Sequence, residues 1–180
     1  MTSNTESISQ VIRRRRNKLA IKDGYVSLLV RILVLTILGY LIFTQVFLLS
    51  RTIGNEMFPA VKDGDLIIGF RLQDYYEKND VITYKVNGQR KVGRFLAREG
   101  DVVNMDDSGT LRINGTVQSG EIMYPTYAKD EVEYPYTVPE DHVFVLGDYR
   151  TQTIDSRDFG AIPMEDVEGK VITLLRRRGL

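Results

Sequence analysis

Cysteine and histidine, two residue types that many enzymes use as nucleophile or base, are scarce in this sequence. The chain has no cysteine, which excludes disulfides, cysteine nucleophiles and cysteine-bound metals. Its single histidine, His142, stands directly before the apolar run Val143-Phe144. A Ser-His-Asp triad would need this residue, and no pattern places it near a candidate serine. We therefore expect His142 on the surface or at the start of a strand, and we expect no metal and no cofactor.

A carboxylate, Glu56, holds the most distinctive position. It lies in Gly54-Asn55-Glu56-Met57-Phe58-Pro59, which Gly64-Asp65 follows. A carboxylate in an apolar groove can act as a general base, but an aspartic-protease mechanism needs a second carboxylate paired with it. We interpret Glu56 instead as an acid that is solvated or paired with an arginine.

Two further stretches combine charged residues with turn residues. Residues 91–101 read KVGRFLAREGD, and residues 147–160 read GDYRTQTIDSRDFG. In the second stretch Asp155 and Arg157 are expected to pair with each other and to order the backbone, because carboxylate and guanidinium make strong charge-assisted hydrogen bonds. Asp148 and Arg150 are likewise expected in structural ion pairs.

In their order along the chain, these stretches resemble the sequence boxes of type I signal peptidases. In that family a serine stands directly before Met-x-Pro, a lysine box reads approximately Lys-Arg-x-x-Gly-x-Pro-Gly-Asp, and a later box reads Gly-Asp-Asn-Arg-x-x-Ser-x-Asp-Ser-Arg-x-x-Gly. Residues 167–171 (VEGKV) resemble the strand that closes the family's domain. The resemblance covers nearly the whole chain, and the last box is its most specific part. It implies a vestigial site or groove formed by Gly54, Asn55, Met57, Pro59, Thr153, Asp155, Ser156 and Arg157.

The resemblance also places two unsuitable residues at the catalytic positions. Glu56 takes the place of the serine, and alignment on Gly100-Asp101 puts Gly93 in the place of the lysine. A Ser/Lys hydrolase needs a desolvated lysine to take the proton of the serine hydroxyl. Lys91 shares a strand face with position 93 but is displaced by about 7 Å, which we judge too far for direct substitution. We therefore predict a pseudoenzyme.

The N-terminal part of the chain predicts a membrane anchor. Residues 1–50 carry seven Lys/Arg and two Asp/Glu, whereas residues 51–180 carry seventeen and twenty-two. Residues 32–49 contain no charge, and with the apolar residues before them they are long enough to span a bilayer. A buried core helix and a cleavable signal peptide are the alternatives; the segment is long for the second, and a small-x-small cleavage site is lacking.

The basic cluster Arg13-Arg14-Arg15-Arg16 precedes the apolar run, so the positive-inside rule places the N-terminus in the cytoplasm. We predict a cytoplasmic basic tail at 1–24, an anchor in the lipid bilayer at 25–50 and an extracytoplasmic domain at 51–180. The position of the cluster favours a role in topology over nucleic-acid binding.

The predicted outer domain is mainly β. Short β-rich runs at 65–70, 81–86, 110–113, 143–146 and 169–175 are separated by turn signals such as Asn87-Gly88 and Asn114-Gly115. Asn114-Gly115-Thr116 also matches a glycosylation sequon, but we interpret it first as a hairpin turn. No long amphipathic helix follows the anchor, so the expected architecture is a signal-peptidase-like β-sheet domain behind one transmembrane helix.

The resemblance implies a non-catalytic accessory protein of Gram-positive bacteria. Degenerate members with an acid and a glycine at the two catalytic positions are encoded with pili and are required for pilus polymerisation. The expected role is chaperone-like, with pilin subunits as partners and a sortase as a further one. The alternatives are a signal peptidase with an unusual or engineered active site and a purely structural membrane protein.

Overall fold

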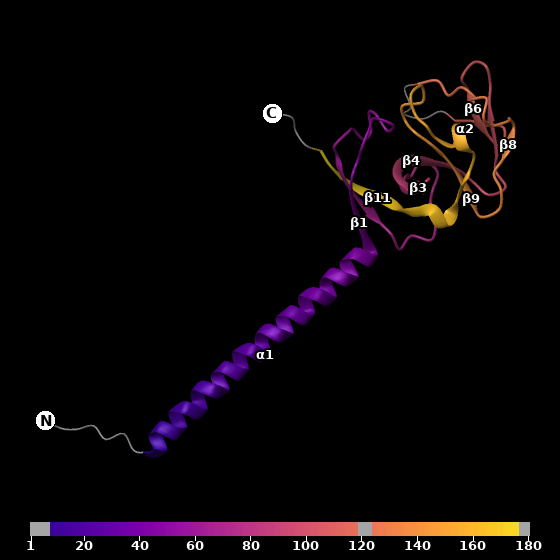
Figure 1. Cartoon of the computed structure of the whole chain (residues 1–180). Coiled ribbons are helices and arrows are strands. Elements are labelled where there is room, and N and C mark those ends of the chain that lie inside the picture. The colour runs from indigo at the N-terminus through magenta and orange to yellow at the C-terminus, as the bar shows by residue number, and fades with distance from the viewer. Residues whose placement is uncertain (1–7, 119–123, 177–180) are drawn as a thin grey trace. The chain divides into compact units, whose positions relative to one another are not determined.

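A computed structural model describes residues 8–118 and 124–176 of the chain. The chain divides into two units, residues 1–44 and residues 45–180. The described part of the first unit, residues 8–44, is helical and belongs to α1 (Ile8–Val46), whose last two residues fall in the second unit (Figure 1). By length and composition α1 is a candidate membrane span. The prediction of one N-terminal apolar helix is confirmed.

The boundaries of this helix differ from the predicted ones at both ends. Residues 8–24, predicted as a tail, are helical, and the first seven residues of that tail lie outside the described residues. At the other end the last four residues of the predicted anchor, 47–50, belong to β1 (Phe47–Arg51). The reason is tertiary, because each residue of β1 pairs with a residue of the next strand, from Phe47 with Phe70 to Arg51 with Leu66.

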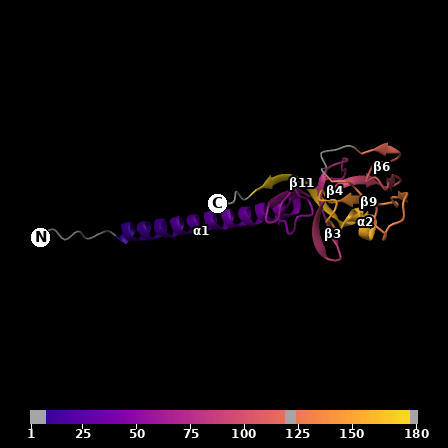
Figure 2. The same ribbon diagram turned by 90° about the horizontal axis from the view of Figure 1, so that it is seen from above.

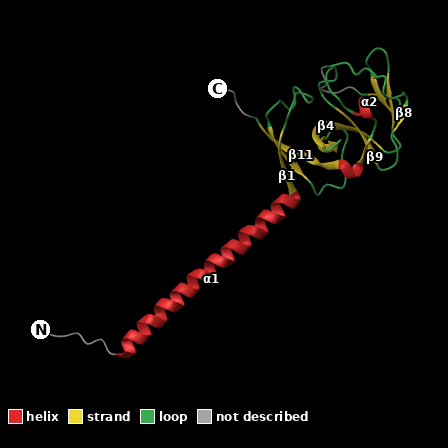
Figure 3. Ribbon diagram, in the orientation of Figure 1, coloured by secondary structure: helices red, strands yellow, loops and turns green. Residues whose placement is uncertain are grey.

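The second unit is built on a seven-stranded antiparallel sheet with the strand order β1-β2-β11-β3-β4-β9-β10 (Figure 3). Its other strands are β2 (Leu66–Phe70), β3 (Val81–Val86), β4 (Gln89–Arg98), β9 (His142–Leu146), β10 (Ile162–Pro163) and β11 (Val167–Leu175). β11 lies between β2 and β3 and joins the early strands to the later ones. This placement agrees with the predicted closing strand.

A smaller sheet with the order β7-β6-β5-β8 completes the domain. Its strands are β5 (Val102–Met105), β6 (Leu111–Ile113), β7 (Thr116–Val117) and β8 (Tyr136–Thr137). In both Figure 1 and Figure 2 it lies at the end of the domain that carries β9. Apolar side chains of β5 and β6 form one core cluster with Phe144 and Leu146 of β9. Two short helical segments, α2 (Ser156–Phe159) and η1 (Met164–Asp166), flank β10.

The mainly β fold class is confirmed, and all five predicted strand runs contain a strand. The Asn87-Gly88 and Asn114-Gly115 turns connect β3 to β4 and β6 to β7, with positive φ at both residues of each turn. Such φ values are those of type I′ hairpins. The predicted runs do not include β1, β4, β5 or the two-residue strands β7, β8 and β10. In β4, five charged or amide side chains hide the periodicity.

Candidate functional site

Glu56 lies in the connection between β1 and β2, and its main chain is held in place. The amide of Tyr149 donates to the Glu56 carbonyl at 3.0 Å, and the following residue, Met57, is buried. The Glu56 side chain remains about a third exposed, and its Oε1 atom lies 2.7 Å from Nζ of Lys91. Lys91 Nζ also donates to the Ile154 carbonyl at 3.3 Å.

This ion pair corrects two expectations. The partner of Glu56 is a lysine, not an arginine or solvent alone, and Lys91 is not too far away to reach the position before Met57. Two residues along a strand displace the backbone by about 7 Å, but the four-carbon stem of a lysine spans a distance of this order. As an ammonium, Lys91 has three donors and no lone pair that could accept a proton from a nucleophile.

The space beside Gly93 is filled by its neighbours. A Cβ atom at this position would lie 2.4 Å from Cγ1 of Val145 and 3.0 Å from Cε1 of Tyr84. Both neighbours are buried. Position 93 therefore accepts no side chain in this packing, and the only lysine that reaches Glu56 among the described residues comes from position 91.

Tyr84 lies close to both positions. Burial, followed by the charges of Glu56 and Asp155, raises the pKa of its phenol above the usual range. The phenol is therefore neutral at physiological pH, and Tyr84 supplies no negative charge to the site.

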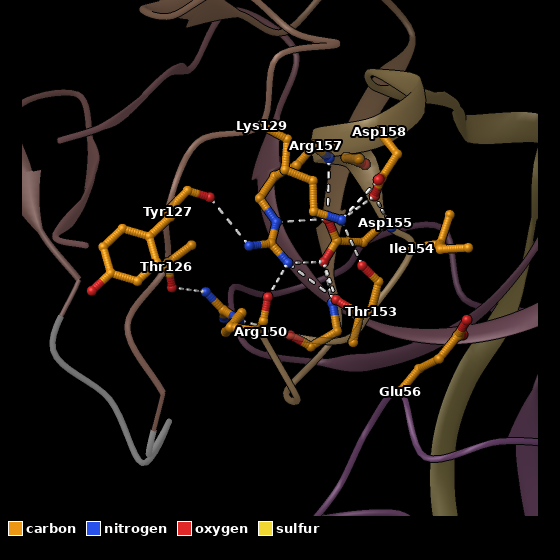
Figure 4. Close-up of polar contacts among 12 residues, drawn as sticks. Glu56, Thr126, Tyr127, Lys129, Arg150, Thr153, Ile154, Asp155, Arg157 and Asp158 are labelled. Atoms are coloured by element: carbon orange, nitrogen blue, oxygen red, sulfur yellow. Dashed lines mark hydrogen bonds and ion pairs between the residues drawn. The ribbon is translucent and has the colours of Figure 1, made fainter. Parts of the chain in front are cut away.

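A buried polar network lies next to Glu56 and contains four of the predicted residues (Figure 4). Oδ1 and Oδ2 of Asp155 each accept a hydrogen bond from the Arg157 guanidinium, at 2.9 Å. Asp155 also accepts from the Thr153 hydroxyl at 2.6 Å and from the Gly147 amide at 3.1 Å. The side chains of Asp155 and Arg157 are at most 2% exposed. The prediction that this pair orders the backbone is confirmed.

The network fixes the ends of two elements. Asp155 is the N-cap of α2, and Asp158 completes a capping box by accepting from the Asp155 amide. The Ser156 hydroxyl accepts from the Val145 amide on β9 at 2.9 Å. Ser156 is therefore a structural residue that links α2 to the sheet. The hydrogen bond given for its hydroxyl is to β9 and does not involve Glu56.

The pairing expected for Asp148 and Arg150 is correct for the first residue only. Asp148 forms a bidentate pair with Arg94, at 2.7 and 2.6 Å. Arg150 instead donates to the Gly147 carbonyl and to the Thr126 hydroxyl. Burial lowers the pKa of Arg150 to about 10, so the guanidinium remains charged at neutral pH.

The remaining predicted residues of the groove are distributed around Glu56. The Gly54 amide, in a left-handed conformation with φ 87°, donates to Asp63 at 2.8 Å. Asn55 accepts from the Asp63 amide, and Pro59 is exposed on the turn after Met57. His142 is the first residue of β9, and its Nδ1 contacts the Glu140 carbonyl. Its predicted place at the start of a strand is confirmed.

A groove of about 500 Å³ passes Glu56 and Lys91. One wall consists of residues 50–54 with Glu56, Met57 and Val61, and the other of residues 89–92 at the start of β4. β3 pairs with β4 along residues 89–94, whereas β9 pairs only from Arg94 onward. Within the described residues, the second edge of residues 89–92 therefore has no strand partner, which is the condition for adding an extended peptide as a further strand.

Sequence reasoning missed two contributors to this site, Tyr84 and Lys129. It considered a third, Lys91, but took the strand displacement without the length of the lysine side chain. Tyr84 closes position 93 from the neighbouring strand, and Lys129 donates to the Thr153 carbonyl and to both Asp158 oxygens at 2.7–2.8 Å. No sequence signal links Lys129 to α2, because the contact depends on the path of a loop.

No group of three potential metal ligands occurs among the described residues.

The ion pair at the site is expected to contribute little to stability. Replacing Lys91 with methionine should change the free energy of unfolding by less than about 1 kcal/mol, because pairs of this exposure are screened by solvent. Chemical denaturation of the two proteins measures the difference. Arg94→Met is the contrasting variant, since it leaves Asp148, with a side chain only 5% exposed, without its partner; a smaller loss for Arg94→Met than for Lys91→Met would contradict this assignment.

Part of the loss of stability on acidification is expected to come from the buried carboxylate of Asp155. Burial alone raises the pKa of Asp155, but the hydrogen bonds and charge of Arg157, with the Thr153 hydroxyl, outweigh it and hold the pKa below the usual range. A lower pKa in the folded than in the unfolded state adds stability above about pH 4, which is lost as the pH falls through the folded pKa. Asp155→Asn should therefore lose less stability than the wild type between about pH 6 and pH 3. Equal losses in urea titrations at these pH values would contradict the prediction.

Related sequences identify the family of this chain. Residues 25–175 match the family model described as "Signal peptidase, peptidase S26". Signal peptidase I of Bacillus licheniformis is 30% identical over 156 residues, covering 77% of this chain and 81% of the relative. The probable thylakoidal processing peptidase 2 of Arabidopsis thaliana is 28% identical over 134 residues, covering 66% of this chain and 35% of that protein. The chain thus spans about a third of the length of this plant relative.

A crystal structure of a signal peptidase I from Enterococcus faecalis V583 aligns with a TM-score of 0.47 and 31% sequence identity, covering 56% of this chain and 98% of that chain. The extent of the family match, together with the Bacillus relative, decides the class: the chain belongs to the peptidase S26 family of signal peptidases.

Proposed function

We propose that this protein is a catalytically silent, membrane-anchored member of the signal peptidase family that binds an extended peptide segment without cutting it. The observation that carries the proposal is the Glu56–Lys91 ion pair at the position directly before Met57-Phe58-Pro59. Cleavage through an acyl-enzyme requires a hydroxyl nucleophile and a base that accepts its proton. A carboxylate paired with an ammonium provides no hydroxyl nucleophile, and the ammonium has no lone pair with which to accept a proton.

Peptide binding does not require the lost residues. The free edge of residues 89–92 offers main-chain hydrogen-bonding groups, and the groove beside it gives room for side chains of an added strand. The Tyr149 amide holds the Glu56 carbonyl on one wall, and pairing with β3 holds residues 89–92 of the other wall. Binding without cleavage would protect the client from being destroyed.

The biological role that we propose is that of an accessory, chaperone-like factor in pilus assembly in Gram-positive bacteria, with pilin subunits as clients and a sortase as a further partner. The anchor, with its N-terminus in the cytoplasm, would keep the binding domain at the outer face of the membrane, where pilins leave the secretion machinery. The charge asymmetry of the chain supports this topology.

Capture of a pilin by the full chain tests this role. Immobilised full-length protein in detergent is expected to retain a purified pilin. Val92→Pro, which blocks a main-chain group at the free edge of β4, should reduce this retention, and Val117→Pro in β7, outside the groove, is the matched control. Retention that is equal in all three proteins, or absent in the wild type, would count against the proposal.

The alternative function is a signal peptidase with an unusual active site, which is favoured by the names of the relatives as signal peptidases or processing peptidases. Incubation of the full chain with a pre-protein separates the two functions. We expect no removal of the signal peptide, and no change on Glu56→Ala. Cleavage by the wild type that disappears in Glu56→Ala would establish the alternative.

A further inference from the structure

Three aromatic side chains from separate segments gather beside Glu56, outside the groove described above. The ring centroids of Phe58 and Tyr149 lie 6.1 Å apart, and those of Tyr149 and Tyr124 lie 4.8 Å apart. We call Phe58, Tyr149 and Tyr124 the aromatic row. All three side chains are partly exposed, so their rings offer apolar surface to a partner.

The aromatic row is fixed relative to the site. Phe58 follows Glu56 by two residues, and the amide of Tyr149 donates to the Glu56 carbonyl. A Cβ atom at Gly147 would lie 2.7 Å from this same carbonyl oxygen, so the two loops are in direct contact. None of the three rings lines the groove between residues 50–57 and β4. The row therefore extends the surface around Glu56 beyond that groove.

Apolar side chains around Glu56 are exposed. Ile154, whose carbonyl accepts from Lys91, has a side chain that is 58% exposed, and Ile53 on the groove wall is 92% exposed. The row itself has a cationic neighbour, because Nζ of Lys62 lies 5.6 Å from the centroid of the Phe58 ring. Exposed apolar side chains that cluster around a polar centre are typical of an interaction surface. Tyr149 also stands where the family's box has an asparagine, so the middle ring of the row is a departure of this chain from the pattern that it resembles.

We propose that the aromatic row binds the part of the client peptide that continues past Glu56, through an aliphatic or aromatic side chain of that part. The proposal rests on the proposed function, because it needs a peptide that is bound and not cut. A peptidase releases the segment beyond the cleaved bond, whereas a protein that leaves the chain intact can use both sides of this point for binding. The groove and the row both adjoin Glu56, since Glu56 lines the groove and its carbonyl accepts from the Tyr149 amide.

Two lengths of one probe peptide test this assignment. The short peptide comes from a pilin precursor and ends at the last residue before its signal-peptide cleavage point; the long peptide adds about six residues, which span about 20 Å when extended. The long peptide should bind the full chain about 3- to 10-fold more tightly, the gain expected from one or two aromatic contacts. Fluorescence anisotropy in detergent measures both affinities.

Substitutions in the aromatic row test whether its rings cause the tighter binding of the long peptide. Tyr149→Ala and Phe58→Ala should abolish the difference between the two peptides, whereas Tyr149→Phe should preserve it. Tyr75→Ala removes a tyrosine that is 56% exposed and belongs to neither surface, and should leave the difference unchanged. Thermal melting verifies that each variant is folded.

The outcomes separate this inference from the function on which it rests. If neither peptide binds the wild type, both the binding function and the role of the row are wrong. If both peptides bind but the long one gains nothing, or if its gain survives Tyr149→Ala and Phe58→Ala, the groove binds peptide and the role of the row is wrong.

Discussion

Replacing Asp155 with alanine is expected to lower the free energy of unfolding of the β domain by about 3–5 kcal/mol, the loss typical of removing one partner from a buried ion pair. The Arg157 guanidinium would keep its charge in a site where it is 2% exposed, without the carboxylate that now accepts two of its hydrogen bonds. The Gly147 amide and the Thr153 hydroxyl would lose their acceptor as well. Equilibrium denaturation with urea measures the effect.

Asp158→Ala is the matched comparison on the same short helix. Its carboxylate pairs with Lys129, and the two side chains are 23% and 28% exposed. The expected loss is about 1 kcal/mol, from the weakened cap and the partly screened pair. A double substitution of Asp155 and Arg157 by leucine should cost less than Asp155→Ala, since it leaves no unpaired buried charge. Equal losses for Asp155→Ala and Asp158→Ala would contradict the central place given to the Asp155–Arg157 pair.

The second large effect is expected when serine is introduced at position 56 and lysine at position 93. The double variant Glu56→Ser with Gly93→Lys is expected to remain unable to cleave a pre-protein and to lose about 1–3 kcal/mol of stability, the usual result of overpacking a core. The reason is the 2.4 Å approach between a Cβ at position 93 and Cγ1 of Val145, a residue without exposed surface. Cleavage of a labelled pre-protein and urea denaturation are the two measurements.

Removal of the obstructing methyl groups provides the control. In a double-mutant cycle Val145→Ala should be less costly when position 93 carries lysine than when it carries glycine, with a coupling of about 0.5–3 kcal/mol. The triple variant is the form in which a lysine at position 93 has room to approach a serine at position 56. Cleavage by the double variant alone would contradict the packing argument, and zero coupling with Val145 would do the same.

The elements of the fold that depend on local sequence were predictable. The apolar run fixes the helix, because a chain segment of this length and composition satisfies its own backbone hydrogen bonds. Asn87-Gly88 and Asn114-Gly115 fix two hairpins, because asparagine and glycine tolerate the left-handed backbone that a two-residue turn needs. The boundary between α1 and β1 was not predictable, since pairing with β2 overrides the apolar continuity of residues 46–50.

In the candidate site, too, some contacts could be predicted from local sequence and others could not. The Asp155–Arg157 pair could be predicted, because both residues belong to one short segment. The partner of Glu56 could not, since it depends on the strand register that places Lys91 opposite Tyr84 and on the lysine rotamer that reaches across the groove. Tyr84 and Val145 close the space at Gly93 from two different strands.

By itself, the sequence determined that this protein has a carboxylate at position 56 and a glycine at position 93, behind an apolar N-terminal segment. The resemblance to signal peptidases is what places these two residues at the serine and lysine positions. The residue types decide this, because chemistry such as proton acceptance belongs to the side chain. Only the tertiary structure decided that Glu56 is paired with Lys91, that position 93 is filled by its neighbours, and that three aromatic rings lie beside the pair. These facts depend on contacts between separate segments, such as Glu56 with Lys91, 35 positions apart, and Phe58 with Tyr149, 91 positions apart. Such contacts are set by strand order and packing.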